Sequence, residues 1–166
     1  MKMNKSKLGF TLIELLIVIA IIGILAVAFL PNVMGAPAKG RQTARVADLQ
    51  KIAGVLTNLS LTSALPASGC VTDAFITPMI ASFGGIVPKD KLATNVLLAG
   101  ATTCGAGEYV YVNYTGITTN KYSFGVFAKV EDPTTGNYAC ASNTIPTDAE
   151  PTLTPGAGDC YGVLVE

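Results

Sequence analysis

One long apolar run near the N-terminus constrains this chain more than any other feature. Residues 10–30 contain 18 apolar residues and a single charge, Glu14. As an α-helix with a rise of about 1.5 Å per residue, the run is roughly 31 Å long, enough to span a bilayer core. Lys2, Lys5 and Lys7 precede it, and no acidic residue accompanies them. This positive flank predicts a cytoplasmic N-terminus and an exported C-terminal part.

Glu14 distinguishes the run from an ordinary export signal. A secretory signal peptide has a shorter apolar stretch followed by a small-residue cleavage site, whereas here Pro31 follows and only Ala36 and Ala38 resemble such a site. A plain signal anchor leaves Glu14 without a role. An ionised carboxylate in a membrane helix costs about 2.5–3.5 kcal/mol on insertion scales. Glu14 is therefore a candidate functional residue that needs a partner.

Residues 9–16, Gly-Phe-Thr-Leu-Ile-Glu-Leu-Leu, resemble the class III signal of type IV pilins and of their relatives, the type II secretion pseudopilins. The matching features are the lysine-bearing leader, a glycine before an aromatic residue, and a glutamate five residues into the cleaved chain. Gly23 and Pro31 also stand where many pilins have a glycine and a proline. The close match covers about residues 1–35, and beyond it the resemblance is architectural.

The resemblance implies how this segment is processed and used. A prepilin peptidase would cut between Gly9 and Phe10 on the cytoplasmic face and would usually N-methylate Phe10. The Glu14 carboxylate would then attract the N-terminal ammonium of a neighbouring subunit's Phe10. That pairing supplies the partner that the cost of burying Glu14 requires.

Two helix-breaking residues predict a stretch of low helix stability inside the apolar run. Pro31 lacks an N–H and clashes one turn back, so a kink or a locally melted turn is expected near Val27. Gly23 weakens the same stretch by about 1 kcal/mol relative to Ala. Unwinding during assembly, which the resemblance implies, and a static kink are the two alternatives. Gly35 and Pro37 predict a second bend just past the membrane.

Helical periodicity returns from about residue 38 to residue 61. An apolar stripe recurs every three to four residues, which predicts an amphipathic helix packed on a sheet. The stripe comprises Val46, Leu49, Ile52 or Ala53, Leu56 and Leu59. Four charged residues lie mostly off it, namely Arg41, Arg45, Asp48 and Lys51. They are expected on a solvated surface, with intersubunit ion pairs as the alternative.

The C-terminal part carries the strand signals. Strands are predicted at 108–114, 121–130, 137–141 and 161–165, and short helices at 73–83 and 89–98. With the resemblance, these elements imply an α+β pilin fold. A long N-terminal helix, half protruding and apolar and half amphipathic, would pack on an antiparallel sheet of about four strands.

The aromatic residues between Tyr109 and Phe127 allow two interpretations. They could form a stacking platform for single-stranded nucleic acid, or a core packed against the helix. Only Lys121 and Lys129 accompany them, so no basic patch is present and the core is favoured.

The expected organisation has five parts. They are a cleaved leader at 1–9, an apolar transmembrane or filament-core half-helix at 10–36, an amphipathic half-helix at 37–61, a connecting region at 62–107, and a β-sheet with a C-terminal disulfide-bounded loop at 108–166.

The four cysteines predict disulfides. None forms a C-x-x-C pair, which argues against zinc and thioredoxin-like sites, and all lie on the exported side, where disulfides persist. Three connectivities are open. We favour Cys140 with Cys160 and Cys70 with Cys104, because the first pair would staple the C-terminal loop to the sheet, as pilins often do.

Neither an enzyme nor a cofactor is expected. The chain has no histidine, which excludes a Ser-His-Asp triad, a Cys-His dyad and His-ligated zinc. A calcium loop at residues 142–159 is the alternative, since Ca²⁺ prefers carboxylate and carbonyl oxygens. However, Asp148, Glu150 and Asp159 are scattered along it. A plain surface loop is therefore favoured.

The resemblance then implies a structural function. We expect a type IV pilus subunit serving adhesion, twitching motility or DNA uptake, with a type II secretion pseudopilin as the alternative. The implied partners are identical subunits, prepilin peptidase, the inner-membrane assembly platform and, before assembly, the membrane itself. Loss of the leader lysines leaves 8 basic and 11 acidic side chains, so no direct nucleic-acid binding is expected. The precursor would span the inner membrane once, and the filament would lie at the cell surface.

Overall fold

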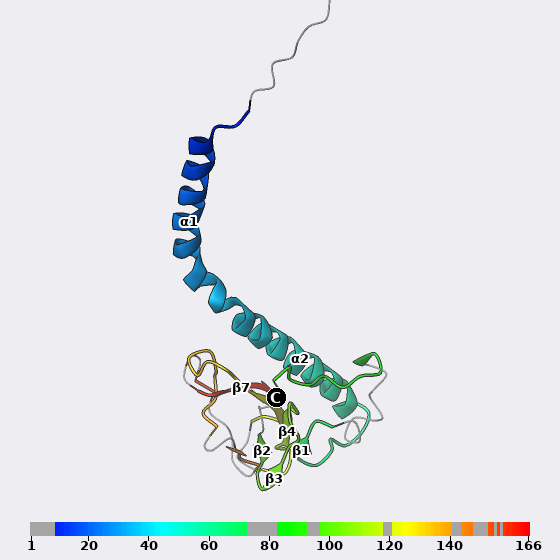
Figure 1. The fold of residues 1–166 in the computed structure, drawn as a ribbon. Coiled ribbons are helices and arrows are strands. Elements are labelled where there is room, and N and C mark those ends of the chain that lie inside the picture. Colours follow the sequence, from blue (N-terminus) through cyan, green and yellow to red (C-terminus); the bar gives the residue numbers. More distant parts are fainter. Residues whose placement is uncertain are drawn as a thin grey trace, which may run out of the picture. The chain divides into compact units, whose positions relative to one another are not determined.

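A computed structural model describes residues 9–72, 83–92, 97–117, 121–140, 144–147, 153–154, 156 and 158–166. The chain divides into two compact units, residues 1–39 and residues 40–166. The second unit is called the head below. Within the described residues, two helices are followed along the chain by seven short strands (Figure 1).

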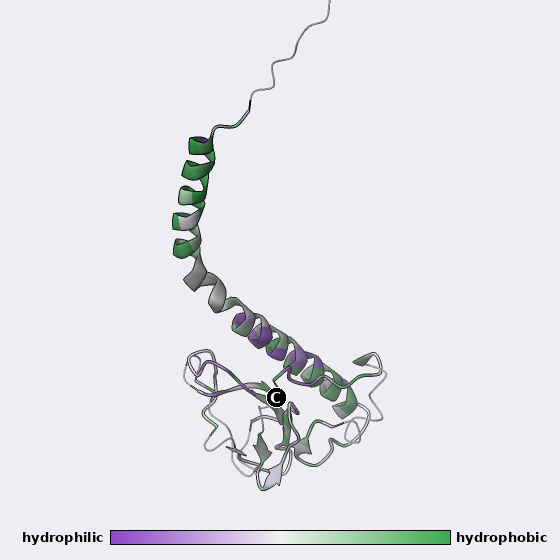
Figure 2. Cartoon of the chain, viewed as in Figure 1, coloured by the Kyte–Doolittle hydropathy of each residue, from purple (hydrophilic) through white to green (hydrophobic). Residues whose placement is uncertain are grey.

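The first unit is dominated by helix α1, Leu12–Met34. Its stretch Leu12–Phe29 is long and apolar enough to cross a membrane, and no residue of that stretch is buried in the structure. In Figure 2 most of the ribbon of this stretch has the colour of hydrophobic residues. Apolar residues therefore surround the helix on all sides, as expected of a helix that is covered by lipid or by other chains rather than by its own fold.

Of the two breaks that the sequence predicts in the long helix, the one at Gly35 and Pro37 is present. The melted turn predicted near Val27 is absent, since α1 runs without interruption through Pro31 to Met34. The break comes at Gly35, and helix α2, Ala36–Ser60, starts directly after it. Pro37 lies in the first turn of α2, where a missing N–H costs little.

Helix α2 presents one buried face. Leu49, Ile52 and Leu56 are fully buried and Ala53 nearly so, which confirms the centre of the predicted apolar stripe. Val46 and Leu59, at its two ends, are only partly buried. The fully buried part of the stripe is therefore shorter than the sequence periodicity predicts.

The strands of the head form two sheets. The larger sheet is antiparallel, with the order β1-β4-β5-β7. Its strands are β1 (Gly69–Cys70), β4 (Val110–Asn113), β5 (Phe124–Lys129) and β7 (Cys160–Val165). A smaller sheet has the order β3-β2-β6 and contains β2 (Leu98–Ala99), β3 (Thr102–Thr103) and β6 (Thr144–Ile145). The expected α+β architecture with a four-stranded antiparallel sheet is confirmed.

Both faces of the larger sheet are covered. Side chains alternate along a strand, so Tyr109 and Tyr111 pack toward Leu49, Ile52 and Leu56 of α2. The side chains that point to the other face of the sheet belong to a second cluster. This cluster contains Val110, Val112, Tyr114, Phe127, Leu97 and Ile145. The aromatic residues are thus core residues, and the interpretation as an exposed stacking platform is wrong.

Two predicted elements are absent from the described residues. Residues 89–92 form no helix and Leu98 belongs to β2, while residues 93–96 of that predicted helix lie outside the described residues. Residues 137–140 form no strand beyond a single bridge between Tyr138 and Cys160. Of the predicted helix at 73–83 and the hairpin loop at 115–120, residues 73–82 and 118–120 lie outside the described residues.

An ion-pair cluster attaches α2 to the rest of the head. The Arg45 guanidinium, 1% exposed, donates from Nε to Asp90 Oδ2 at 2.6 Å and from Nη2 to Glu131 Oε1 at 2.7 Å. Arg41 Nε donates to the same Glu131 oxygen at 2.8 Å. Asp48 accepts a hydrogen bond of 2.9 Å from the Tyr109 hydroxyl. The prediction of a solvated surface is therefore wrong for Arg45, which is buried and joins α2 to Asp90 and Glu131, whereas Lys51 is exposed as predicted.

Replacement of Arg45 by Met tests this cluster. The change leaves the Asp90 carboxylate, 3% exposed, without its main partner, and breaking a buried pair in this way costs about 3–5 kcal/mol. The loss in the free energy of unfolding is measured by denaturant unfolding of the full chain in detergent micelles, with the circular dichroism of the tyrosines as the signal. Lys121→Met is the matched control, since the Lys121–Glu166 pair is more than half exposed on both sides and should contribute less than about 1 kcal/mol. Equal losses in the two variants would contradict the assignment.

The same cluster predicts a pH dependence of stability. Hydrogen bonding from Arg41 lowers the pKa of Glu131 from 4.5 to about 2. A carboxyl group with a lowered pKa in the folded state stabilises the fold above its unfolded pKa, and this contribution disappears as the pH falls from about 4.5 toward 2. In Glu131→Gln that part of the acid-induced loss should be missing. Unfolding titrations between pH 7 and pH 2 measure it, and an unchanged profile would refute the role of Glu131. Glu166→Gln, at an exposed carboxyl, is the control.

Candidate functional site

The start of helix α1 brings the candidate processing and assembly residues together. Gly9 and Phe10 precede the helix and are exposed, with Phe10 83% exposed. Gly9, Phe10, Thr11 and Glu14 line one open hollow of about 380 Å³. The peptide bond between Gly9 and Phe10 is thus accessible and lies outside regular secondary structure.

Glu14 forms a reciprocal cap with Thr11. Glu14 Oε2 accepts hydrogen bonds from the Thr11 backbone N–H at 2.8 Å and from the Thr11 hydroxyl at 2.7 Å. The Thr11 hydroxyl oxygen in turn faces the Glu14 N–H at 3.3 Å. This is a capping box, which satisfies backbone N–H groups that the first helical turn leaves unpaired. Its Thr-x-x-Glu signature is a local sequence pattern, so this cap is predictable from the sequence alone.

The cap leaves half of the carboxylate available. Both hydrogen bonds from Thr11 go to Oε2, and within the described part of the chain no group donates to Oε1. Thr11 therefore offsets part of the cost of placing Glu14 in an apolar setting. A second donor, such as an ammonium from another chain, can still reach Oε1.

Gly23 and Pro31, the other predicted assembly residues, both lie within α1. A Cβ added at Gly23 would meet no atom within 4 Å, so no packing in this structure requires a glycine there. The apolar residues around it are exposed as well. Whatever role Gly23 has must therefore come from backbone freedom or from contacts with molecules other than this chain.

The cysteines form two disulfides in the head. Cys70 is bonded to Cys104 and Cys140 to Cys160, with Cα–Cα distances of 5.3 and 5.8 Å. These are the pairings that the sequence analysis favours. The first joins β1 to the residue after β3, and the second joins the start of β7 to the segment that bridges to it.

A metal site does not fit the cysteine region of the head. Cys140, Asp159 and Cys160 lie within 4.8 Å of one another. Their sulfur atoms are bonded together, however, and the Asp159 carboxylate accepts the Cys140 N–H at 2.8 Å. Thiolate ligands are therefore missing. Asp148 and Glu150, considered above for calcium, lie outside the described residues.

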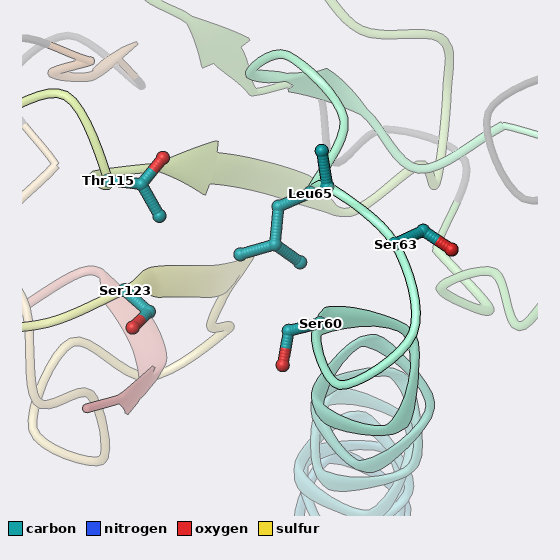
Figure 3. Close-up of a pocket in the computed structure, with 6 residues that line it drawn as sticks. Ser60, Ser63, Leu65, Thr115 and Ser123 are labelled. Carbon is teal, nitrogen blue, oxygen red and sulfur yellow. The ribbon is translucent and has the colours of Figure 1, made fainter.

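A second hollow, of about 400 Å³, lies at the C-terminal end of α2 (Figure 3). Ser60, Ser63, Ala64, Leu65, Thr115 and Ser123 line it. Two of the hydroxyls already donate within the chain, Ser60 to the Thr57 carbonyl and Thr115 to the Asn113 side chain. The lining contains no carboxylate, amine or other general base that could activate a serine. It offers no catalytic constellation.

Comparison with known proteins supports the interpretation of the N-terminal segment. Residues 4–30 match the family model of the prokaryotic N-terminal methylation motif. The chain is also 40% identical over 53 residues to the type II secretion system core protein G of Pseudomonas aeruginosa. That match covers 32% of this chain and 37% of the relative, so the chain spans little more than a third of the relative's length. No solved structure matches the chain.

The geometry and the comparisons agree on one segment. An accessible Gly-Phe bond, a capped glutamate at the start of an exposed apolar helix, and the matched methylation motif all fall within residues 4–30. The chain carries the class III signal that type IV pilins and pseudopilins share.

Proposed function

We propose that this chain is a structural subunit of a type IV pilus, which is inserted in the membrane as a prepilin and polymerises through its N-terminal helix. The apolar surface of α1 carries the proposal. Its side chains from Leu12 to Phe29 find no cover within the chain, and such a surface is stable only against lipid or against other apolar helices. A subunit that moves from a bilayer to a filament core meets both requirements.

Processing would prepare the helix for this move. Prepilin peptidase would cut after Gly9 and N-methylate Phe10, and the accessible, non-helical peptide between them suits a protease. Cleavage removes Lys2, Lys5 and Lys7, which favour retention of the N-terminus at the cytoplasmic face. The cleaved chain begins with an ammonium group next to the Glu14 cap.

Assembly would use Glu14 as the register-setting residue. Thr11 occupies Oε2, and Oε1 would receive the Phe10 ammonium of a neighbouring subunit. Opposite charges attract strongly in a low-dielectric environment, and an unpaired charge there is penalised. A subunit inserted at the wrong height would leave both charges unpaired, which selects one register.

A pseudopilin of a type II secretion system is the second candidate. The similarity to a protein named type II secretion system core protein G favours it. The disulfide between Cys140 and Cys160 favours the pilus, because it staples the C-terminal region as pilins often do. We place the pilus first, with adhesion, twitching motility or DNA uptake as its roles.

The proposed partners follow from this assignment. They are identical subunits, prepilin peptidase, the inner-membrane assembly platform and the membrane before assembly. We assign no enzymatic activity, no cofactor and no direct nucleic-acid binding, in keeping with a processed chain of 8 basic and 11 acidic side chains. The precursor would span the inner membrane once with a cytoplasmic N-terminus, and the filament would be exposed at the cell surface.

Glu14→Ala tests the assembly step. We expect cleavage after Gly9 to continue while filaments are lost, because the incoming ammonium no longer has a carboxylate to pair with. Glu14→Gln separates charge from hydrogen bonding, since it retains an acceptor for Thr11 but cannot form an ion pair. N-terminal sequencing reports processing and electron microscopy reports filaments. Glu166→Ala, at an exposed carboxyl of the head, is the control, and normal filaments from Glu14→Ala would sink the proposal.

Sheared surface material tests the choice between the two filament types. For a pilus we expect long fibres at normal expression, built from a chain that begins at Phe10 and seen by electron microscopy. Fibres that appear only on overexpression would favour the pseudopilin. Intact Met1 at the N-terminus of the fibre subunit would contradict both assignments.

A further inference from the structure

Strand β7 is an edge strand of the larger sheet. In the order β1-β4-β5-β7 it has a neighbouring strand on one side only. In an antiparallel ladder, alternate residues of such a strand turn their backbone N–H and C=O groups away from the sheet. The Asp159 carbonyl accepts the Val130 N–H on the β5 side, so the outward groups of β7 belong to Cys160, Gly162 and Leu164.

This edge has none of the usual features that prevent pairing with another chain. The strand reads Cys-Tyr-Gly-Val-Leu-Val and contains neither a charged residue nor a proline. Natural proteins commonly place charges or prolines on edge strands, because an open edge can pair with the edge of another chain. The edge of β7 must therefore be covered in another way.

A segment that precedes β7 in the chain covers its first outward residue. The Asn137 and Tyr138 N–H groups both donate to the Cys160 carbonyl, at 2.9 and 3.1 Å, and the Cys160 N–H donates to the Tyr138 carbonyl at 3.0 Å. The disulfide between Cys140 and Cys160 fastens this segment to the strand. Both outward backbone groups of Cys160 are therefore paired.

The Asn137 side chain covers the next outward residue. Its Oδ1 accepts the Gly162 N–H at 2.6 Å, and its Nδ2 donates to the Gly162 carbonyl at 2.9 Å. The backbone itself leaves the edge here, since the Gly136 carbonyl accepts the Gly156 N–H instead. The side-chain amide thus makes the two hydrogen bonds that a residue of a neighbouring strand would make.

We propose that the outer edge of β7 is a pairing surface for β7 of a second copy of this chain, and that the Asn137 side chain keeps it closed in the single chain. Within the described residues, no group pairs with the outward backbone of Leu164. Without the Asn137 amide, the open edge lengthens to include Gly162. Two such edges related by a two-fold axis pair antiparallel, with Gly162 of each copy opposite Leu164 of the other.

Closure of this edge is a property of the head and does not depend on the type of filament. All the residues that form it lie within the second compact unit. In the proposed filament, pairing between heads would compete with assembly through α1. The closure can nevertheless be measured on unassembled chains.

Asn137→Ala in the full chain, in a large excess of detergent micelles, tests the proposal. At low protein concentration the variant should be monomeric, and its Gly162 amide should exchange about tenfold faster than in the unchanged chain, because one hydrogen bond is lost. At higher concentration the variant should dimerise while the unchanged chain stays monomeric. The amides of Gly162 and Leu164 should then become protected. Sedimentation measures the dimer, and hydrogen exchange measures the protection.

Asn113→Ala is the matched control. Asn113 Nδ2 donates to the Pro66 carbonyl at 2.8 Å and Oδ1 accepts the Thr115 N–H at 2.9 Å, so this change also removes two hydrogen bonds between an asparagine side chain and the backbone. Asn113 ends β4, which has a strand on both sides. No edge opens there, and this variant should stay monomeric. The circular dichroism of the tyrosines checks folding, and serine replaces alanine at either position if the alanine variant is unfolded.

The outcomes are distinct. Dimerisation of the Asn137 variant alone, with new protection at Gly162 and Leu164, supports the proposal. A monomer at every concentration overturns it, as does a dimer without that protection. Equal association of the Asn113 variant also overturns it, because lost stability would then be the cause. Since no fibre is formed in this experiment, a negative result leaves the filament proposal to its own tests.

Discussion

The apolar surface of α1 is the constraint on which the rest of this structure depends. The stretch Leu12–Phe29 of this helix is apolar, and none of its residues is buried in the structure. Free energy is gained only when lipid or other copies exclude water from it. The single charge at its start, Glu14, is tolerable because Thr11 satisfies one of its oxygens.

The head must therefore be stable without help from α1. It achieves this with two hydrophobic clusters on opposite faces of one small sheet, two disulfides and a buried ion-pair cluster. Arg45 is central to it, since its guanidinium joins α2 to the segment at Asp90 and to the residue that follows β5. A planar group with several donors can bridge two carboxylates at once, which a lysine ammonium does less well.

Much of the organisation could be predicted because its signals are local. The apolar run, the Gly-Phe bond, Glu14 and the strands at β4, β5 and β7 all appear in residue order, and the structure contains them. The sequence-based prediction was wrong where contacts with residues far along the chain determine whether a side chain is buried. Arg45 lies beside the apolar stripe and looks like a surface residue until Asp90 is placed opposite it. Asp90 in turn is held by Arg45, and the residues around it, 89–92, form no helix.

The sequence by itself determined that this chain has an apolar helix with a glutamate near its start, preceded by three lysines, since periodicity, charge and short motifs act over a few residues. Only the tertiary structure decided which of the three cysteine connectivities is formed, which charges are buried and which of the two predicted helix breaks occurs. Those outcomes depend on contacts between segments up to 90 residues apart, as between Arg41 and Glu131. Contacts of this kind are not written in any local sequence pattern.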